Sequence, residues 1–408
     1  MKGACIVGQS GGPTSVINSS VAGVVLSALK NENITEVYGA LNGLAGIINE
    51  NIIDFKKEDI EEIELLKYTP SAALGSVRLF LDDYKVNSDI HQKILNVFKK
   101  YNIRYFFYIG GNDSMDSCHK INEYLKSQDY ECRVIGIPKT IDNDLVCCDH
   151  TPGYGSACKF IATTISEIYL DINAYTKGRV TIVEVMGRDA GWLTASSKLA
   201  SLNGCDPDLI YLPETAFNIE DFLEKVNNIY TKNKKAFIIV SEGIKDANGE
   251  YILKYRNFNN NDSFGHMQLG GVASVLCEIV SNKFGFPVRA IELNLPQRCA
   301  SHLSSKTDID EAYMCGEKGV EFATTGVTGK MITIERNNNI FTYGTTDLKN
   351  VAAQVKNVPL NFISKNGDNI TQEYIDYALP LIQGEPNITY VNGLPKFSKL
   401  KKVLINKK

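Results

Sequence analysis

Short apolar runs of strand length alternate along the chain with longer stretches in which apolar residues recur at helical spacing. The first run, residues 4–7, is followed by a glycine-rich turn and then by apolar residues at positions 16, 17, 21, 24, 25 and 28. A strand, a turn and an amphipathic helix in this order form the repeating unit of a parallel, doubly wound sheet. The pattern therefore predicts an α/β fold.

The same unit recurs further along the chain. More apolar runs occupy residues 105–109, 133–137, 179–185, 209–212, 236–240 and 288–293. In folds of this kind, ligands bind beyond the carboxyl ends of the strands, so the turns after these runs are where chemistry is expected. A polar stretch at 257–263 is typical of an inserted loop, and a domain boundary is predicted near residue 150.

The charge distribution excludes two classes of partner. The 408 residues carry a formal net charge of -4, and Lys and Arg are spread along the whole length. No basic stripe offers a surface to nucleic acid or to an anionic membrane, and no run of about 20 apolar residues could cross a membrane. We therefore expect no nucleic acid and no membrane partner.

Cysteine and histidine usage narrows the chemistry further. The ten cysteines include no CxxC pair, and the five histidines form no metal-spaced set. Cysteines in this pattern are typical of buried thiols in a reducing compartment, and no signal-peptide segment is recognisable at the N-terminus. A cytoplasmic protein is expected, and a zinc hydrolase or a Ser-His-Asp enzyme is poorly supported.

Two turns are rich in glycine. Residues 8–14 include Gly11 and Gly12 and open a helix, where free N–H groups favour an anion such as phosphate. Tight packing alone is the alternative, because neither GxGxxG nor GxxxxGK[ST] is satisfied. The second turn pairs Gly110 with Gly111, and either Asp113 or Ser114 could simply cap the helix that follows. The glycine pair, however, would let a ligand approach the backbone closely.

The densest polar cluster follows the run at 133–137. Lys139, Thr140, Asp142, Asn143 and Asp144 lie within six residues of one another. Two carboxylates, an ammonium and a hydroxyl supply a base, a metal ligand and a charge clamp, which phosphoryl transfer needs. The alternative is a solvated turn rich in Asx caps. A long amphipathic helix begins soon afterwards and pins the loop, which favours a functional site.

Further candidates follow the later strands. Met186, Gly187 and Arg188 come after the run at 179–185, and Glu242 comes after the run at 236–240. The planar fork of an arginine suits a phosphoryl oxygen. Spacing alone leaves Arg289 and Arg298 open to two interpretations, as solvated surface charges or as ligands of a second phosphate.

Taken together, these turns resemble the signatures of the phosphofructokinase family at Gly110 to Ser114, Thr140 to Asp144 and Met186 to Arg188, in the same order up to about residue 330. The resemblance implies two doubly wound, Rossmann-like lobes with largely parallel sheets and an active site in the cleft between them. It assigns residues 1–150 to a lobe for the phosphoryl donor and 151–330 to a lobe for the sugar phosphate. Residues 331–408 are predicted to form a C-terminal extension that packs back on the lobes.

By that resemblance, Asp142 is the base that takes the proton from the sugar 1-hydroxyl, and Arg188 stabilises charge on the transferring phosphoryl group. The substrate-binding residues it implies are Gly11, Gly12, Arg78, Thr140, Asp142, Arg179, Met186, Gly187, Arg188, Glu242, Arg289 and Arg298. In the family, some phosphate-binding arginines come from a neighbouring subunit, so a homodimer or homotetramer is implied.

Two positions decide the donor, and both count among the catalytic residues. Asp113 and Lys139 stand where ATP-dependent members of the family usually have glycine and pyrophosphate-dependent members have Asp and Lys. The resemblance therefore implies reversible phosphoryl transfer from pyrophosphate to fructose 6-phosphate, in glycolysis. The alternatives are ATP as donor, or a catalytically silent subunit that senses sugar phosphates. Sedoheptulose 7-phosphate as a second acceptor stays open.

The resemblance also implies Mg²⁺ as cofactor. Asn112 stands where many relatives have an Asp associated with magnesium, which removes one negative ligand. Asp144 is then the better of these two candidate ligands.

Overall fold

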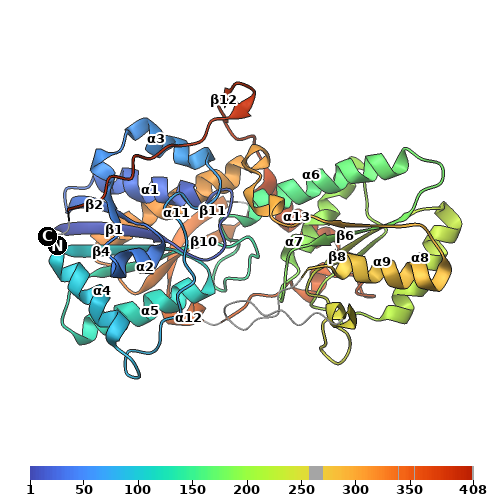
Figure 1. Ribbon diagram of the computed structural model, residues 1–408, viewed down its shortest axis with the longest axis horizontal. Helices are drawn as coiled ribbons and strands as arrows, with labels where there is room; N and C mark the ends of the chain where they lie inside the picture. The colour runs from blue at the N-terminus through green and yellow to red at the C-terminus, as the bar shows by residue number, and fades with distance from the viewer. Residues whose placement is uncertain (257–269, 339, 353, 407–408) are drawn as a thin grey trace.

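Two large β-sheets, one in each of two lobes, organise the computed structural model of the chain (Figure 1). The structure describes residues 1–256, 270–338, 340–352 and 354–406, so the predicted loop at 257–263 lies outside the described residues. Helices cover both faces of each sheet, and most neighbouring strands are parallel. The predicted α/β fold class, with two doubly wound lobes, is confirmed.

The larger sheet has seven strands in the order β11-β10-β5-β4-β1-β2-β3. They are β1 (Gly3–Gln9), β2 (Ile34–Ala40), β3 (Ile52–Asp54), β4 (Ile103–Gly110), β5 (Arg133–Pro138), β10 (Lys330–Asn337) and β11 (Ile340–Asp347). The helices of this lobe are α1 (Ile17–Leu29), α2 (Gly43–Ile48), α3 (Ile60–Leu65), α4 (Asp89–Lys100), α5 (Asn112–Ser127), α11 (Lys306–Thr324) and α12 (Leu348–Val351). In the described part of this sheet, the edge strands β3 and β11 pair antiparallel with their neighbours, and the other pairs are parallel.

Strand β1 shows why the apolar runs lack polar alternation. Ala4 and Ile6 belong to the core that α4 and α5 cover, whereas Cys5 and Val7 belong to the core under α1 and α11. Both faces of the strand are therefore packed, and every residue from Gly3 to Gln9 is buried. A central strand of a doubly wound sheet has this property, because helices cover both of its faces.

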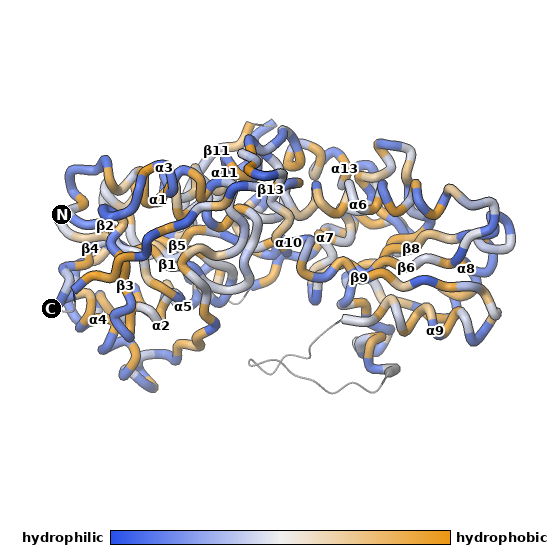
Figure 2. The backbone as a smooth tube through the Cα atoms, turned by 45° about the horizontal axis from the view of Figure 1, so that its top comes forward, coloured by the Kyte–Doolittle hydropathy of each residue, from blue (hydrophilic) through white to orange (hydrophobic). Residues whose placement is uncertain are grey.

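The smaller sheet has four parallel strands in the order β7-β8-β6-β9. They are β6 (Val180–Val185), β7 (Leu209–Tyr211), β8 (Ala236–Ser241) and β9 (Val288–Glu292). The helices of this lobe are α6 (Tyr154–Asn173), α7 (Trp192–Ala195), α8 (Ile219–Asn233), α9 (Val272–Phe284) and α10 (Pro296–Cys299). Figure 2 shows β6 and β8 as mainly hydrophobic strands in the middle of this lobe. The carboxyl ends of its strands are directed towards the larger lobe (Figure 1).

The predicted lobe boundaries are wrong at residue 330. Helix α11 lies within the range 151–330 but packs on α1 of the larger lobe, and β10 and β11 extend the larger sheet beyond β5. A Cβ on Gly316 of α11 would lie 2.2 Å from the carbonyl oxygen of Ser20, so the two helices touch through glycine. The reason is that α1 is buried on nearly all sides and needs a second helix to cover it.

The C-terminal segment contacts both lobes. Helix α13 (Gln372–Ala378) places Tyr374, Ile375 and Ala378 in the core beside α6 and α7. After the hairpin of β12 (Tyr390–Val391) and β13 (Leu394–Pro395), the chain returns to the larger lobe, where the N–H of Ile405 donates to the carbonyl of Ile52 at 2.9 Å. In Figure 1 the segment runs along the top of the molecule from one lobe to the other.

The helices were compared with the length and hydrophobicity of a membrane-spanning helix. Among the residues that the structure describes, no helix combines the length and the apolar character that crossing a bilayer requires.

Candidate active site

The glycine-rich turn after β1 faces two cations. The Nζ of Lys139 donates to the carbonyl of Gly12 at 2.7 Å. A Cβ on Gly11 would lie 3.2 Å from that Nζ, and one on Gly12 would lie 3.0 Å from Nη1 of Arg298. Gly11 also has a φ of 73°, in the left-handed region that favours glycine. Side chains at these two positions would occupy the space in front of both cations, so the sequence needs glycine here.

Lys139 is the most buried charge in this corner. Its relative exposure is 3%, and burial lowers the pKa of its ammonium to about 8. Asp142 and Asp144 act in the opposite direction, whereas the nearby Arg298 and Arg78 lower the pKa further. Burial and the closeness of Arg78 likewise lower the pKa of Arg298. Cations that depress one another's pKa values in this way form a site for an anion of high charge.

The loop after β5 holds the two carboxylates, and it is anchored at its base. The N–H of Thr140 donates to the carbonyl of Pro152 at 3.3 Å, and the hydroxyl of Thr151 donates to the carbonyl of Thr140 at 2.9 Å. The Oγ1 of Thr140 in turn accepts from the N–H of Asp142 at 3.1 Å. The loop is therefore a pinned segment rather than a free solvated turn.

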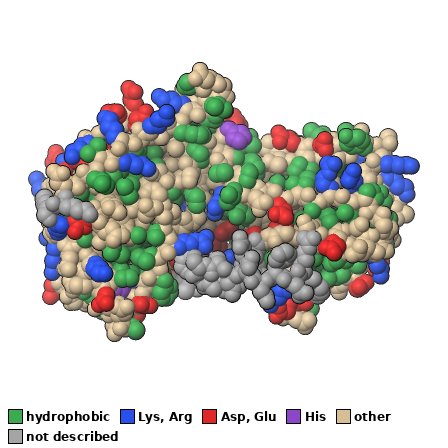
Figure 3. Space-filling model, in the orientation of Figure 1, with side chains coloured by type: hydrophobic (Ala, Val, Ile, Leu, Met, Phe, Trp, Pro, Cys, Tyr) green, Lys and Arg blue, Asp and Glu red, His purple; other side chains and the backbone are tan. Residues whose placement is uncertain are grey.

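Asp142 lies where the two lobes meet. Burial raises the pKa of its carboxyl above the usual range, and the negative charges of Asp144 and Glu242 raise it further. Lys139 from the larger lobe and Arg188 from the smaller lobe oppose that shift. A carboxyl that responds to charges from both lobes lies at their junction. Figure 3 shows the surface hollowed between the lobes, with Lys and Arg side chains along part of the hollow.

The start of α5 provides a fit for a hard cation. The Nδ2 of Asn112 donates to Oδ2 of Asp144 at 2.9 Å. The amide oxygen Oδ1 of Asn112 and the second carboxylate oxygen Oδ1 of Asp144 are buried and have no hydrogen-bond partner among the described residues. Oxygen ligands of this type suit Mg²⁺, which takes one or two protein ligands and completes its shell with water and phosphate. No group of three or more His, Cys, Asp or Glu residues in the described ranges could hold a metal by itself.

The other polar residues at the start of α5 do not act as side-chain caps. Gly111 is the N-cap residue, without a side-chain hydrogen bond, and the Oγ of Ser114 contacts the Oγ of Ser10 instead. A Cβ on Gly110 would lie 2.7 Å from the Oγ of Ser10, so this glycine permits the close approach of the turns after β1 and β4. Asp113 is exposed in the first helical turn, where a negative charge also suits the helix dipole.

The smaller lobe contributes the residues that follow β6 and β8. The Oε1 of Glu242 accepts from the N–H of Gly187 at 3.1 Å, and the Oε1 of Gln297 accepts from the N–H of Met186 at 3.2 Å. The Nε of Arg188 is buried without a hydrogen-bond partner among the described residues. Gln297, from α10, is a contact that the sequence did not predict. These bonds order the turn and leave a guanidinium group with unused donor capacity.

Arg179 and Arg289 lie apart from these residues within one chain. Arg179 immediately precedes β6, and Arg289 pairs with Thr181 near the beginning of β9. Both stand at the amino ends of the strands, roughly 20 Å along β6 from Met186 at about 3.3 Å per residue. The side chain of Arg289 is 47% exposed and lies 3.7 Å from Asp171. The structure therefore brings these two arginines near each other but not to the hollow of the same chain.

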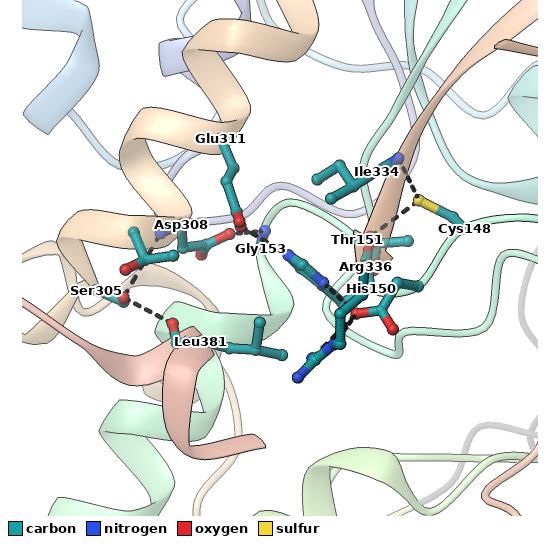
Figure 4. A network of polar contacts seen from close by, with 12 residues as sticks. Cys148, His150, Thr151, Gly153, Ser305, Asp308, Glu311, Ile334, Arg336 and Leu381 are labelled. Atoms are coloured by element: carbon teal, nitrogen blue, oxygen red, sulfur yellow. Dashed lines mark hydrogen bonds and ion pairs between the residues drawn. The ribbon is translucent and has the colours of Figure 1, made fainter. Parts of the chain in front are cut away.

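A buried polar network anchors the far end of the loop after β5 (Figure 4). The Nδ1 of His150 lies 2.7 Å from Asp149, and its Nε2 lies 2.7 Å from Glu311 of α11. The Nε of Arg336, from β10, donates to Asp149 at 3.0 Å. Burial lowers the pKa of His150, but Glu311 and Asp149 outweigh burial and raise it above its usual value. The two carboxylates thus favour the charged form of the imidazole between them.

Two residues of the C-terminal segment reach the same loop and were not predicted. Lys356 and Tyr377 contact Asn143, which stands between Asp142 and Asp144. Their own sequence neighbourhood carries no motif. The one hint in the sequence was Asn143 itself. It is the polar residue between Asp142 and Asp144 to which the sequence analysis gave no role and no binding partner.

Comparison with known proteins gives a consistent result. The phosphofructokinase family matches residues 4–293. The pyrophosphate--fructose 6-phosphate 1-phosphotransferase of Halomonas elongata is 39% identical over 98% of this chain and 96% of its own length. The protein of the same name from Rhodospirillum rubrum is 41% identical over 95% of this chain and 96% of its own. The crystal structure of pyrophosphate-dependent phosphofructokinase from Nitrosospira multiformis has a TM-score of 0.91 at 37% identity, over 100% of this chain and 99% of that one.

Proposed function

The chain belongs to the phosphofructokinase family, and we propose that it transfers a phosphoryl group from pyrophosphate to the 1-hydroxyl of fructose 6-phosphate, reversibly and in glycolysis. The products are fructose 1,6-bisphosphate and phosphate. Relatives that match over nearly the whole chain carry this donor and this acceptor in their names. The cytoplasm is the proposed location, since all ten cysteines are free thiols that suit a reducing compartment.

The observation that carries the proposal is the buried Lys139 beside Gly11 and Gly12. Lys139 is 3% exposed, its Nζ donates to the carbonyl of Gly12, and its pKa responds to two carboxylates and two arginines close by. A buried cation needs an anionic partner, and the glycines leave room for one in front of it. Pyrophosphate is short and densely charged, so it suits a small corner lined by Lys139 and Arg78, with Arg298 beside them to bind the phosphate of fructose 6-phosphate.

Asp142 is the proposed general base. The acceptor hydroxyl must lose its proton as it attacks the phosphorus, and the carboxylate of Asp142 lies between the two lobes to receive it. Burial raises the pKa of Asp142, and a base is most effective when its pKa approaches the working pH. Thr140, whose hydroxyl accepts from the N–H of Asp142, orients the loop and would also contact the sugar.

Arg188 is the proposed stabiliser of the transferring group. In the transition state, charge spreads over the equatorial oxygens of the phosphoryl group, and preorganised donors there lower the barrier. The buried Nε of Arg188 has no hydrogen-bond partner among the described residues, so its donor is available. Met186, in the turn after β6, and Glu242, which accepts from the N–H of Gly187 in that turn, would contact the sugar phosphate.

Enzymes of this family generally use Mg²⁺, and we propose Asn112 and Asp144 as its protein ligands. Their two buried Oδ1 atoms support this choice, since each needs a partner that the described residues do not supply. When bound, the ion neutralises phosphate charge. The chain's own contribution is to hold both oxygens in place through the bond between Nδ2 of Asn112 and Oδ2 of Asp144.

Donor choice is proposed to depend on Asp113 and Lys139. Lys139 neutralises the departing phosphate, while the side chain of Asp113 would occupy the space that the α-phosphate of ATP needs. Because Asp113 is exposed, solvent screens its charge, so its effect on ATP is mainly steric. We also propose a homo-oligomer, in which Arg179 and Arg289 would serve the sugar phosphate of a neighbouring subunit.

A coupled assay tests the reaction directly. Formation of fructose 1,6-bisphosphate is measured with Mg²⁺ and either pyrophosphate or ATP, and Asp142→Asn protein purified in parallel reports any contaminating kinase. Pyrophosphate should be preferred in kcat/KM by at least ~10³-fold, or about 4 kcal/mol of transition-state discrimination. A preference for ATP would overturn the donor assignment, and turnover with neither would favour the silent subunit.

A further inference from the structure

Asn143 is held in a conformation that its own loop does not explain. It lies between Asp142 and Asp144, its relative exposure is 0%, and its φ of 53° is in the left-handed region. That region is costly for residues other than glycine, although Asn tolerates it better than most. The carboxylates on either side depend on this backbone conformation for their directions.

Both polar atoms of the Asn143 amide bind the C-terminal segment. Its Oδ1 accepts from Nζ of Lys356 at 3.2 Å, and its Nδ2 donates to the hydroxyl of Tyr377 at 2.9 Å. More than 200 residues separate Asn143 from either partner in the sequence. A buried amide that is bonded on both sides has a single favourable orientation, because any rotation would leave buried polar atoms unpaired.

Lys356 contacts the loop at further points. Its Nζ also donates to the carbonyls of Cys148 at 2.9 Å and Asp149 at 2.8 Å, so the ammonium uses three donors on three neutral oxygens. Its backbone N–H donates to the carbonyl of Asp144 at 2.8 Å. The hydroxyl of Tyr377 adds a bond to the carbonyl of Asp149 at 2.8 Å. Hydrogen bonds from Lys356 and Tyr377 therefore hold several points of the segment from Asn143 to Asp149.

The same residue is attached to the smaller lobe. The carbonyl of Lys356 accepts from Nε1 of Trp192 in α7 at 2.8 Å, and its ammonium lies 5.2 Å from the centre of the Trp192 ring. Two residues later, the N–H of Val358 donates to Glu214 at 2.9 Å, and Glu214 also accepts from the N–H of Gly191 at 2.8 Å. Lys356 thus connects a loop of the larger lobe to the helix that follows Arg188.

We propose that Lys356, supported by Tyr377, is a positioning residue for phosphoryl transfer: it holds Asn143 and so sets where the carboxylates of Asp142 and Asp144 lie relative to the smaller lobe. This inference rests on the proposed function. Its effect should fall on kcat, because the base and the metal ligand act on the transition state. Substrate affinity should change little, because Lys139 is held by the carbonyl of Gly12 and not by Lys356.

Three variants test the proposal in the pyrophosphate reaction. Lys356→Met keeps the length of the side chain and removes its charge and donors, and Tyr377→Phe removes one hydroxyl. Lys159→Met is the matched control, because Nζ of Lys159 bonds to the C-terminal segment at Gly384 and Glu385 instead of the loop. Each is assayed for kcat and for the KM of both substrates, together with its melting temperature.

Lys356→Met should lower kcat on the order of 30-fold with each KM within about threefold, since a misplacement of 1 Å can cost ~10² in rate. Tyr377→Phe should lower kcat about three- to tenfold, because the amide of Asn143 keeps its second bond. Lys159→Met should keep kcat within about twofold, because a bond at the surface contributes little. Loss of stability alone, without the selective fall in kcat, would identify a purely structural role.

Specific outcomes overturn the proposal. An undiminished kcat in Lys356→Met, an equal fall in Lys159→Met, or an effect confined to KM would each do so. If Lys356→Met does not fold, Tyr377→Phe decides: a lower melting temperature with unchanged kcat would refute the positioning role. Wild-type protein that is inactive with both donors would overturn the proposed function together with this inference, whereas an active wild type and a fully active Lys356→Met would overturn the inference alone.

Discussion

The chain has two groups of basic residues assigned to phosphate, and their surroundings differ. Around Gly11 and Gly12, Lys139 is buried and its pKa responds to Arg78, Arg298 and two carboxylates. At the amino ends of β6 and β9, Arg289 is about half exposed and its nearest acidic partner is 3.7 Å away. Charges that are removed from water interact strongly, whereas solvated charges are screened.

The comparison shows that residue type alone does not determine how much a charged side chain contributes to phosphate binding. The buried group brings Lys139, Asp142 and Arg188 to one junction within a single chain. The exposed pair lies at the opposite end of the smaller sheet from that junction. We therefore expect substitutions in the buried group to have larger effects, and the exposed pair to act only if a second subunit supplies the rest of a site.

The largest effect should come from Asp142. Asp142→Asn preserves the shape of the side chain but removes the base, so kcat should fall by about 10² to 10⁴, the usual contribution of general base catalysis. Steady-state kinetics with pyrophosphate and a melting temperature close to that of the wild type are needed together. A folded Asn variant that retains most of its kcat would remove Asp142 from this role.

Substitutions of Lys139 and Asp113 should have different effects on activity, because Lys139 is buried and Asp113 is exposed. Lys139→Met keeps the volume of the buried side chain but loses its charge, and kcat with pyrophosphate should fall about 10²- to 10³-fold, as for other preorganised donors. Asp113→Gly should instead raise kcat/KM for ATP by about tenfold, because the exposed carboxylate mainly obstructs space. If both substitutions lowered kcat with pyrophosphate equally, the predicted difference between buried and exposed charges would be wrong.

The two arginine groups can be compared in one pair of variants. Arg298→Ala and Arg289→Ala should each raise the KM for fructose 6-phosphate by roughly tenfold or more, equivalent to about 1.4 kcal/mol. The two variants should differ in whether activity returns when each is mixed with Asp142→Asn subunits. In a homodimer that is unfolded and refolded as an equal mixture, Asp142→Asn with Arg289→Ala should recover about a quarter of wild-type activity at low substrate, since half of the dimers contain one intact site.

The matched control is the mixture of Asp142→Asn with Arg298→Ala. The pKa shift of Arg298 includes Asp142 of the same chain, so every site in the mixed dimer carries one defect and no recovery is expected. Recovery in both mixtures, or in neither, would refute the view that only the exposed pair serves a neighbouring subunit. An unchanged KM in either single variant would remove that arginine from the site.

The last expected effect is on folding stability rather than on turnover, at the buried His150 between two carboxylates. Asp149 and Glu311 raise the pKa of His150, so its charged form stabilises the fold fully below about pH 6.5, its ordinary pKa, and this stabilisation is lost as the pH rises through the raised value. His150→Gln should lower the free energy of unfolding by about 3 kcal/mol at pH 6 and by less at pH 9. Denaturant unfolding at both pH values measures this, and a deficit that grows with pH would contradict the assignment.

Much of the fold could be predicted because its central strands are packed on both faces. Strands β1, β4, β5, β6 and β8 are buried from end to end or nearly so, and they appear in the sequence as continuous apolar runs followed by polar or glycine-rich turns. Strand β11 was missed because it is a partly exposed edge strand whose residues do not form such a run. The return of α11 to the larger lobe was missed because its partner α1 is nearly 300 residues away.

The sequence by itself determined which polar residues come to the carboxyl ends of the strands, because the order of strand, turn and helix forces those turns to one edge of each sheet. The nearness of Asp142 to Arg188 and Glu242, the burial of Lys139 and the contacts of Lys356 and Tyr377 with Asn143 were decided only by the tertiary structure. The physical reason is the distance along the chain over which each effect acts. Hydrophobic periodicity reports how a segment is buried locally, whereas desolvation, charge coupling and the pairing of a buried amide depend on segments from different lobes, and no local pattern specifies which of them will meet.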